Sequence, residues 1–229
     1  MTLGIIGAMD EEVALLLENM TEKEEITIAN CLFVTGNLAE KQVVLLKSGI
    51  GKVNAAMATT IMHERFSPTH VINTGSAGGF ADRLEVGDIV ISTEVVHHDV
   101  DVTGFDYAYG QVPGLPAMYS ADTELITAAI SAIKGLDVQY QEGIIATGDS
   151  FMDKPDHVAF VKDKFPAMIA AEMEAAAVAQ VCYQYDKPFV VIRALSDIAG
   201  KQSSVSFDQF LDKAARNAAQ LIIAMLKAL

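Results

Sequence analysis

The chain has 229 residues, of which 51% are hydrophobic and 20% charged, a composition that excludes a disordered protein and suits a domain with a full core. Its 30 acidic and 16 basic residues give a formal net charge of −14, which argues against nucleic acid or an anionic membrane as a partner because both select a basic face. This charge favours a neutral or zwitterionic small molecule as the ligand.

The sequence carries no membrane or secretion signal that we recognise. No apolar run approaches the roughly 20 residues of a membrane helix, and the start, MTLGIIGAMDEEV, lacks the basic residues that begin a signal peptide. The two cysteines, Cys31 and Cys182, lie in apolar surroundings without a metal-binding spacing. We therefore expect a cytoplasmic protein with two buried thiols, no disulfide and no metal.

The N-terminal segments alternate between strand-like and helix-like patterns. Residues 3–9 predict a strand, after which Asp10 can cap a helix through VALLLENM. Residues 26–36 and 41–47 predict a hairpin-like pair of strands bridged by residues 37–40. Residues 52–65 predict a helix that ends before a proline.

The middle of the chain contains two unusual segments. Residues 70–73 predict a short buried strand that ends in a loop of small residues, 74–79, where a ligand could approach the backbone closely. After a strand at 88–93, residues 96–119 are rich in glycine, proline and aromatic side chains. This second segment is too long for an ordinary connection, so we expect it to be functional or interfacial.

The C-terminal part continues the alternation. A long final helix is expected up to residue 227, opened by the capping-box spacing of Ser206 and Gln209. Without a repeat or a linker, the chain predicts one domain, 1–229, in the α/β class, with a mixed twisted sheet between two helical layers. The other expected elements are helices at 123–133 and 175–184 and strands at 142–147, 168–171 and 189–194.

Three apolar runs are followed by carboxylates. Asp10, Glu11 and Glu12 follow the first, Glu172 and Glu174 the second, and Asp197 the third. The carboxyl ends of strands in parallel-type sheets are where ligand sites form, and buried acids are costly unless they have a role. Each acid alone could stabilise a helix start by roughly 0.3–1 kcal/mol, but three together favour a site.

Several other sites are disfavoured. GIIGAM lacks the glycine spacing of a dinucleotide-binding turn. The run from His97 to Asp101 resembles metal ligands, but neighbours along an extended chain point to opposite faces, so a solvated or subunit-contact loop is the better interpretation. Ser48 and Ser76 have no histidine placed for a catalytic triad. Carboxylates therefore remain as the acid–base groups, and carboxylate pairs suit glycosyl transfer.

Two further features have open interpretations. Arg193 is a base in an otherwise apolar strand and is expected to pair with Glu174 or Asp197. Phe151 and Met152 could belong to the core or could form a flat apolar wall for a purine ring.

The motifs GIIGAMDEEV, KSGIGKVNAA, VINTGSAGG, VGDIV, ATGDSF, AAEMEAAAVA and FVVIRALSDIA occur in this order along the chain. In this combination the sequence resembles the bacterial 5′-methylthioadenosine/S-adenosylhomocysteine nucleosidases, relatives of the purine nucleoside and uridine phosphorylases. The resemblance covers essentially the whole chain and implies a nucleoside phosphorylase-like fold. It also implies a homodimer without cofactor that releases adenine by hydrolysis from methylthioadenosine, adenosylhomocysteine and 5′-deoxyadenosine, in methionine salvage and adenosylmethionine recycling.

The resemblance also implies roles for individual residues. Glu12 matches the base that activates water, Asp197 the acid that protonates adenine, and Glu174 the carboxylate that holds the ribose hydroxyls, ionised while Asp197 is protonated. The other matches are Met173 beside the sugar, Ser76, Ala77 and Gly78 along the purine and sugar, Phe151 and Met152 against the purine, Arg193 and Ser196 around Asp197, Ile50 and Phe207 around the sulfur substituent, and Val102, Phe105 and Pro113 in a lid from the neighbouring subunit.

The choice between water and phosphate as acceptor depends on the missing arginines. Related phosphorylases place arginines at the first strand end and before the glycine loop, where this chain has Met9 to Glu12 and Ile72 to Thr74. Acids in these places would repel phosphate in a pocket of low dielectric constant, so we expect hydrolysis. The alternatives are a phosphate-dependent purine nucleoside phosphorylase and a non-catalytic nucleoside-binding protein of the same fold.

Overall fold

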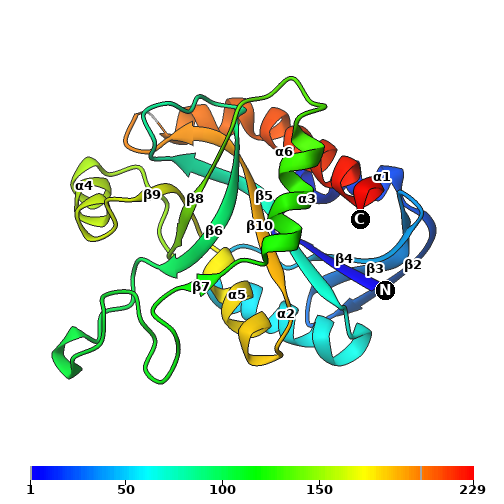
Figure 1. The fold of residues 1–229 in the computed structure, drawn as a ribbon, viewed down its shortest axis with the longest axis horizontal. Coiled ribbons are helices and arrows are strands. Elements are labelled where there is room, and N and C mark those ends of the chain that lie inside the picture. The colour runs from blue at the N-terminus through cyan, green and yellow to red at the C-terminus, as the bar shows by residue number, and fades with distance from the viewer. Residues whose placement is uncertain (1, 202) are drawn as a thin grey trace.

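The computed structural model describes residues 2–201 and 203–229, which form one ten-stranded sheet with six α-helices and one short 3₁₀ helix (Figure 1). The strands are β1 (Thr2–Gly7), β2 (Thr21–Ile28), β3 (Cys31–Leu38), β4 (Lys41–Lys47), β5 (His70–Gly79), β6 (Ile89–His97), β7 (Tyr119–Ser120), β8 (Tyr140–Thr147), β9 (Met168–Glu172) and β10 (Phe189–Ile198). The helices are α1 (Asp10–Asn19), α2 (Lys52–Phe66), η1 (Thr103–Phe105), α3 (Thr123–Ile133), α4 (Pro155–Lys164), α5 (Ala175–Gln184) and α6 (Ser203–Ala228).

Part of the sheet closes into a ring. β5 pairs in parallel with β10 and β1, and its last residues, Gly78 and Gly79, pair antiparallel with β9. Since β10 pairs with β6, β6 with β8 and β8 with β9, the five strands β5, β10, β6, β8 and β9 form a closed ring. β1, β4, β3 and β2 continue from β5 as an open wing. A mixed sheet with helices on both faces is thereby confirmed.

At its end β5 lies between β9 and β10, and the space there requires glycine. A Cβ atom on Gly79 would lie 2.7 Å from a methyl carbon of Leu195, and one on Gly78 would lie 3.2 Å from Asp197 Oδ2. The chain can therefore place β5 between β9 and β10 only with side chains absent at these positions.

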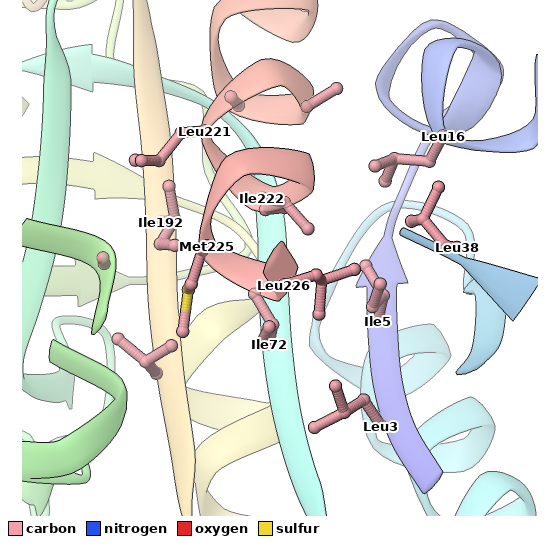
Figure 2. Close-up of a cluster of buried hydrophobic side chains, with 14 of the residues drawn as sticks. Leu3, Ile5, Leu16, Leu38, Ile72, Ile192, Leu221, Ile222, Met225 and Leu226 are labelled. Atoms are coloured by element: carbon pink, nitrogen blue, oxygen red, sulfur yellow. The ribbon is translucent and has the colours of Figure 1, made fainter. Parts of the chain in front are cut away.

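Long apolar side chains hold α6 against one face of the sheet, with α1 and α3 beside it (Figure 2). Burying one leucine or isoleucine side chain stabilises the fold by about 1.5–3 kcal/mol, so this layer fixes the strands whose ends carry the acids. Leu3, Ile5, Ile72 and Ile192 of the strands meet Leu221, Ile222, Met225 and Leu226 of α6 in this cluster.

The opposite face is covered by α2 and α5, whose small residues allow close packing. Ala55 and Ala58 of α2 and Ala175 and Ala179 of α5 are fully buried there. α4 covers the ring strands separately through Val161. No helix within residues 2–201 and 203–229 combines the length and apolarity that crossing a membrane requires.

Local patterns predict several elements correctly, including α3 and α5 at both ends and α2 to within one residue. The predicted strand at 26–36 is wrong, because Ala29 and Asn30 turn the chain with positive φ angles of 50° and 63° and separate β2 from β3. The bridge between β3 and β4 is likewise a tighter turn, at Ala39 and Glu40.

The other corrections concern strand ends and caps. The expected loop at 74–79 is the second half of β5, and β10 runs on through Asp197 to Ile198. Asp10 does not cap α1: it is the first helical residue and pairs with Lys47 at 2.6 Å. Ser206 lies inside α6, and α4 was not predicted.

Candidate active site

A cleft of about 320 Å³ opens where β1, β5, β9 and β10 end and where α1, α5 and α6 begin. It collects most of the residues that the sequence predicts for a site. Its lining residues are Ala8, Met9, Glu12, Ile50, Ser76, Ala77, Gly78, Ser150, Phe151, Met152, Ala171, Glu172, Met173, Glu174, Ser196, Asp197, Ser204, Phe207 and Asp208.

Glu12 reaches the cleft from the first turn of α1 and is held by neutral donors on both oxygens. Oε2 accepts hydrogen bonds from the backbone N–H groups of Ala8 (2.8 Å) and Met9 (3.2 Å). Oε1 accepts from the backbone N–H (2.9 Å) and the hydroxyl (3.1 Å) of Ser76. The β1–α1 turn and β5 together therefore fix this carboxylate in one orientation.

Gly75 allows β5 to pass directly beside Glu12. A Cβ atom at this position would lie 2.6 Å from Glu12 Oε1 and 2.9 Å from its Cδ, closer than non-bonded atoms approach each other. The absence of a side chain at Gly75 therefore sets the position of the Glu12 carboxylate as much as its hydrogen bonds do.

Asp197 is only 1% exposed and lies in β10, where the pairing with β5 shifts register after Leu195. The Ser196 hydroxyl donates to its Oδ1 at 2.9 Å. Burial raises the pKa of the Asp197 carboxyl, while hydrogen bonds from Ser196 and Ser203 act in the opposite direction. The net shift is upward, the direction that a proton donor requires.

Glu174 precedes α5 and is also buried, but it has fewer donors. Its Oε1 accepts one hydrogen bond, from the backbone N–H of Gly51 at 2.8 Å. Burial, followed by the negative charge of Glu172, raises the pKa of Glu174 to about 8, against the opposing effect of Arg193. This upward shift favours the protonated form in the ligand-free protein, and the expectation that Glu174 is ionised while it holds the sugar stays a prediction.

Arg193 lies behind the cleft rather than on its wall, since only 1% of it is exposed. Its Nη2 donates to Glu172 Oε2 at 2.5 Å and to Asn73 Oδ1 at 2.7 Å, and lies 4.0 Å from Glu174 Oε2. Of the two expected partners, Glu174 is a distant one and Asp197 is not one, while Glu172 is the main partner of Arg193. Arg193 can affect a ligand only through the carboxylates in front of it.

The apolar part of the cleft comes from the β8–α4 loop and α6. Met152 is buried, Phe151 is 40% exposed, and the Phe151 ring meets that of Phe207 edge to face at 5.8 Å between centroids. Ile50, which directly precedes the start of α2, lines the same cleft. The contact of these side chains with a purine or a thioether stays a prediction.

Val102, Phe105 and Pro113 do not line this cleft. They belong to the β6–β7 loop (residues 98–118), which extends away from the body at the lower left of Figure 1. Phe105 is 78% exposed. A contribution of these residues to another subunit's site is compatible with this placement and stays a prediction.

The residues from His97 to Asp101, which the sequence suggested as a subunit-contact loop, are hydrogen-bonded to two segments next to the cleft. Asp99 accepts hydrogen bonds from Lys52 Nζ at 2.5 Å and from the backbone N–H of Asp149 at 3.0 Å. The His97 ring contacts Gln180 at 3.0 Å. Within the part of the chain that the structure describes, no three His, Cys, Asp or Glu side chains are arranged to hold a metal.

Sequence reasoning missed some of the cleft. Glu172 was noted only as one of the strand-end acids, although it lies two residues before Glu174. Met9 lies in the same turn as Glu12, and Asp208 directly follows Phe207. The sequence signal that could identify both as cleft residues is therefore their position beside predicted site residues. The other lining residues not assigned to the site are Ala8, Ser150, Ala171 and Ser204.

Comparison with known proteins shows similarity over the whole chain. Residues 2–227 match the Phosphorylase superfamily. A 5′-methylthioadenosine/S-adenosylhomocysteine nucleosidase of Oceanobacillus iheyensis is 64% identical over 227 residues, which cover 99% of each chain. The Neisseria meningitidis nucleosidase of the same name, solved with methylthio-immucillin-A, superposes with a TM-score of 0.98 at 47% identity and covers 100% of this chain and 99% of its own. That of Colwellia psychrerythraea, solved with adenine, has a TM-score of 0.97 at 50% identity, with 99% and 94% covered.

Proposed function

The chain belongs to the Phosphorylase superfamily and, within it, to the 5′-methylthioadenosine/S-adenosylhomocysteine nucleosidases, and we propose that it hydrolyses the N-glycosidic bond of both nucleosides. The products are adenine and either 5-methylthioribose or S-ribosylhomocysteine, as methionine salvage and adenosylmethionine recycling require. 5′-Deoxyadenosine, which has the same adenine and ribose, is a further expected substrate.

One observation carries the choice of water over phosphate. All five ionisable residues that line the cleft are acids: Glu12, Glu172, Glu174, Asp197 and Asp208. A phosphate dianion in this cleft would face these acids, and Arg193, the nearest base behind them, already pairs with Glu172. Like-charge repulsion is strong where water is excluded, so the neutral nucleophile is favoured.

Asp197 supplies the proton for the leaving group. Adenine leaves poorly as an anion, and a proton on N7 lets it leave as a neutral molecule while the bond between N9 and C1′ breaks. The raised pKa of the buried Asp197 carboxyl keeps this proton available, and the Ser196 hydroxyl orients the group. General acid catalysis of this kind contributes about 10²–10⁴-fold.

Glu12 acts on the water that attacks C1′. Three of its donors are backbone N–H groups that hold the carboxylate in place. The fourth is the Ser76 hydroxyl, which can rotate away and leave Oε1 free to accept a proton from water as the new C–O bond forms. The sugar carries positive charge at this stage, and a fixed carboxylate stabilises that charge without reorganising. Proton transfer to Glu12 and from Asp197 balances the hydrolysis.

Glu174 holds the sugar by accepting hydrogen bonds from the ribose hydroxyls, with Met173 beside it. The apolar wall of Phe151 and Met152 receives the adenine ring. Ile50 and Phe207 surround the 5′-thioether, while Ser76, Ala77 and Gly78 lie along the purine and the sugar.

The protein acts in the cytoplasm as a homodimer of single-domain chains (residues 1–229), in which each β6–β7 loop covers the partner's cleft. Large exposed apolar side chains on the loop and on the adjoining helices α2 and α5 support this proposal. Phe105 is exposed on the loop, Val53 and Met57 on α2, and Tyr183 on α5, and exposed apolar side chains of this size gather where a partner covers them.

The decisive experiment incubates the protein with 5′-methylthioadenosine in the presence and absence of phosphate and identifies the sugar product. Free 5-methylthioribose, formed at the same rate without phosphate, supports the proposal. A sugar 1-phosphate that requires phosphate would identify a phosphorylase, and the absence of adenine release would favour a nucleoside-binding protein.

The lid is tested separately with Phe105→Ala. Because Phe105 is exposed in the single chain, we expect an unchanged melting temperature and a raised KM for 5′-methylthioadenosine. Ile26→Ala, which removes another exposed apolar side chain, from β2, is the control. An unchanged KM in Phe105→Ala would remove the lid from the proposal.

A further inference from the structure

The two glutamates of the EME motif have different surroundings. The buried carboxylate of Glu172 accepts hydrogen bonds from Arg193 Nη2 (2.5 Å), from the backbone N–H groups of Glu174 (3.1 Å) and Ala175 (2.9 Å), and from the Thr147 hydroxyl. A carboxylate offers about four acceptor positions. Glu172 is therefore saturated by the protein itself and has no capacity left for a sugar hydroxyl.

Glu174 has the opposite arrangement. It accepts one hydrogen bond, from Gly51, and its second oxygen lies 4.0 Å from Arg193 Nη2, beyond hydrogen-bond distance. Its acceptor capacity faces the cleft. The guanidinium that could neutralise it is engaged by Glu172 and Asn73.

We propose that Glu172 is a positioning residue for the hydrolysis: it holds Arg193 by a hydrogen bond and pins the start of α5, so that the Glu174 carboxyl stays oriented, with Arg193 no nearer than 4.0 Å, until ribose binds. The inference rests on the proposed function, which gives Glu174 its role on the sugar. Glu172 does not touch the substrate and acts only through Glu174 and Arg193.

The charges around the two glutamates support this division. Glu174 faces Glu172 from β9, Arg193 from β10 and Glu12 from α1, and it titrates with a pKa raised to about 8. Glu172 faces Arg193, and its charge also acts on His97 and His98 at the end of β6. Without the negative charge of Glu172, Arg193 would act on Glu174 alone and would lower its pKa.

The test measures the affinity for 5′-methylthioadenosine from pH 6 to 9.5 in two proteins that cannot turn it over, Glu12→Gln and Glu12→Gln/Glu172→Gln. In the first, affinity should rise with pH as Glu174 loses its proton. In the second, the midpoint of this rise should move down by about one pH unit or more, and the maximum affinity should fall because Arg193 competes with ribose for Glu174. An unmoved midpoint overturns the proposal.

Free adenine separates positioning from general damage, because it carries no ribose for Glu174 to hold. Its affinity should be equal in the two proteins, and an equal loss for adenine and nucleoside would overturn the proposal. These binding measurements use proteins without turnover, so a negative result in them concerns the role of Glu172 only. A wild-type protein that releases no adenine would instead overturn the proposed function.

A second variant covers the case in which Glu172→Gln does not fold. Thr147→Val, in the Glu12→Gln background, keeps the charge of Glu172 but removes the hydroxyl that donates to it and that accepts from the backbone N–H of Ala176. Glu172 and the start of α5 are then held less firmly, so the midpoint should move in the same direction by less. No movement in Thr147→Val would contradict the proposal. Glu142→Gln, an exposed residue near the other end of β8, is the matched control and should leave the midpoint in place.

Discussion

The two walls of the cleft hold their carboxylates in different ways. On the wall formed by α1 and β5, Glu12 receives four hydrogen bonds from neutral donors. On the wall formed by β9 and α5, Glu174 receives one hydrogen bond and lies beside a second acid and an arginine. The first wall fixes the orientation of Glu12 by hydrogen bonds, and the second controls the protonation of Glu174 through neighbouring charges.

The difference suits the proposed chemistry. A group that takes a proton from water must point in one direction throughout the reaction, whereas a group that binds sugar hydroxyls can change its protonation as the ligand enters. Substitutions at four positions test the two walls separately, and the largest effect is expected at Glu12.

Replacing Glu12 by glutamine should abolish turnover. The amide keeps the shape but cannot accept a proton from water, so kcat should fall by about 10²–10⁴-fold while nucleoside binding remains measurable by calorimetry. Glu11→Gln, at an exposed neighbouring position outside the cleft, is the matched control. A near-normal kcat in Glu12→Gln would contradict the role of this wall.

Gly75→Ala should be the next most severe change. The new methyl group would lie 2.6 Å from Glu12 Oε1, closer than non-bonded atoms approach, so it must displace the carboxylate. A misplacement of about 1 Å can cost on the order of 10²-fold in rate. Steady-state kinetics should show the loss mainly in kcat. Gly135→Ala, where a Cβ atom would meet only the Ala132 carbonyl oxygen at an ordinary contact distance of 3.6 Å, should behave like the wild type.

Glu174→Gln tests the other wall. It removes a charged acceptor for ribose, and hydrogen bonds to charged groups contribute about 1.5–3 kcal/mol, so we expect KM to rise by about 10- to 100-fold at pH 9. At pH 6.5, where the wild-type carboxyl is mostly protonated, the difference should be smaller. A KM ratio that does not change with pH would contradict the raised pKa of Glu174.

The same variant has a consequence for stability. A carboxyl whose folded-state pKa is raised contributes stability below its unfolded pKa of 4.5 and loses it as pH rises to about 8. The melting temperature of Glu174→Gln, measured without ligand, should therefore increase relative to wild type between pH 5 and pH 8. A constant difference over this range would contradict the assignment.

Ser76→Ala should have the smallest effect. It removes one of four donors to Glu12 and keeps the backbone N–H of the same residue, and a single hydrogen bond contributes about 1 kcal/mol, so kcat/KM should fall by about 5- to 10-fold. A loss as large as that of Glu12→Gln would mean that the hydroxyl itself takes part in the proton transfer.

Much of the fold and the site is readable from the sequence where local rules apply. The helix that ends before Pro68 and the helix capped by Asp122 are determined by helix-terminating and capping residues and by the period of the apolar residues. Resemblance in the motifs placed Glu12, Glu174 and Asp197 in one site, and all three line the cleft. Their catalytic and binding roles stay predictions.

Sequence reasoning failed where a segment's conformation depends on distant partners. Glycines and a serine at 74–79 are typical of a loop, yet the chain is extended there because β9 and β10 pair with it on both sides. For the same reason β10 continues through Asp197. The sequence suggests Glu174 or Asp197 as the partner of Arg193 and not Glu172, since only the packing of β9 against β8 and β5 brings Glu172 closest.

By itself, the sequence determined the α/β class, the positions of most helices and strands, and the family to which the chain belongs, because these depend on local patterns and ordered motifs. The tertiary structure alone decided the closure of the five-stranded ring, the close contact of Gly75 with Glu12, and the different surroundings of the two EME glutamates, of which Glu172 has four donors and Glu174 one. These features depend on distances between residues far apart in the chain, and therefore on the packing of the whole sheet.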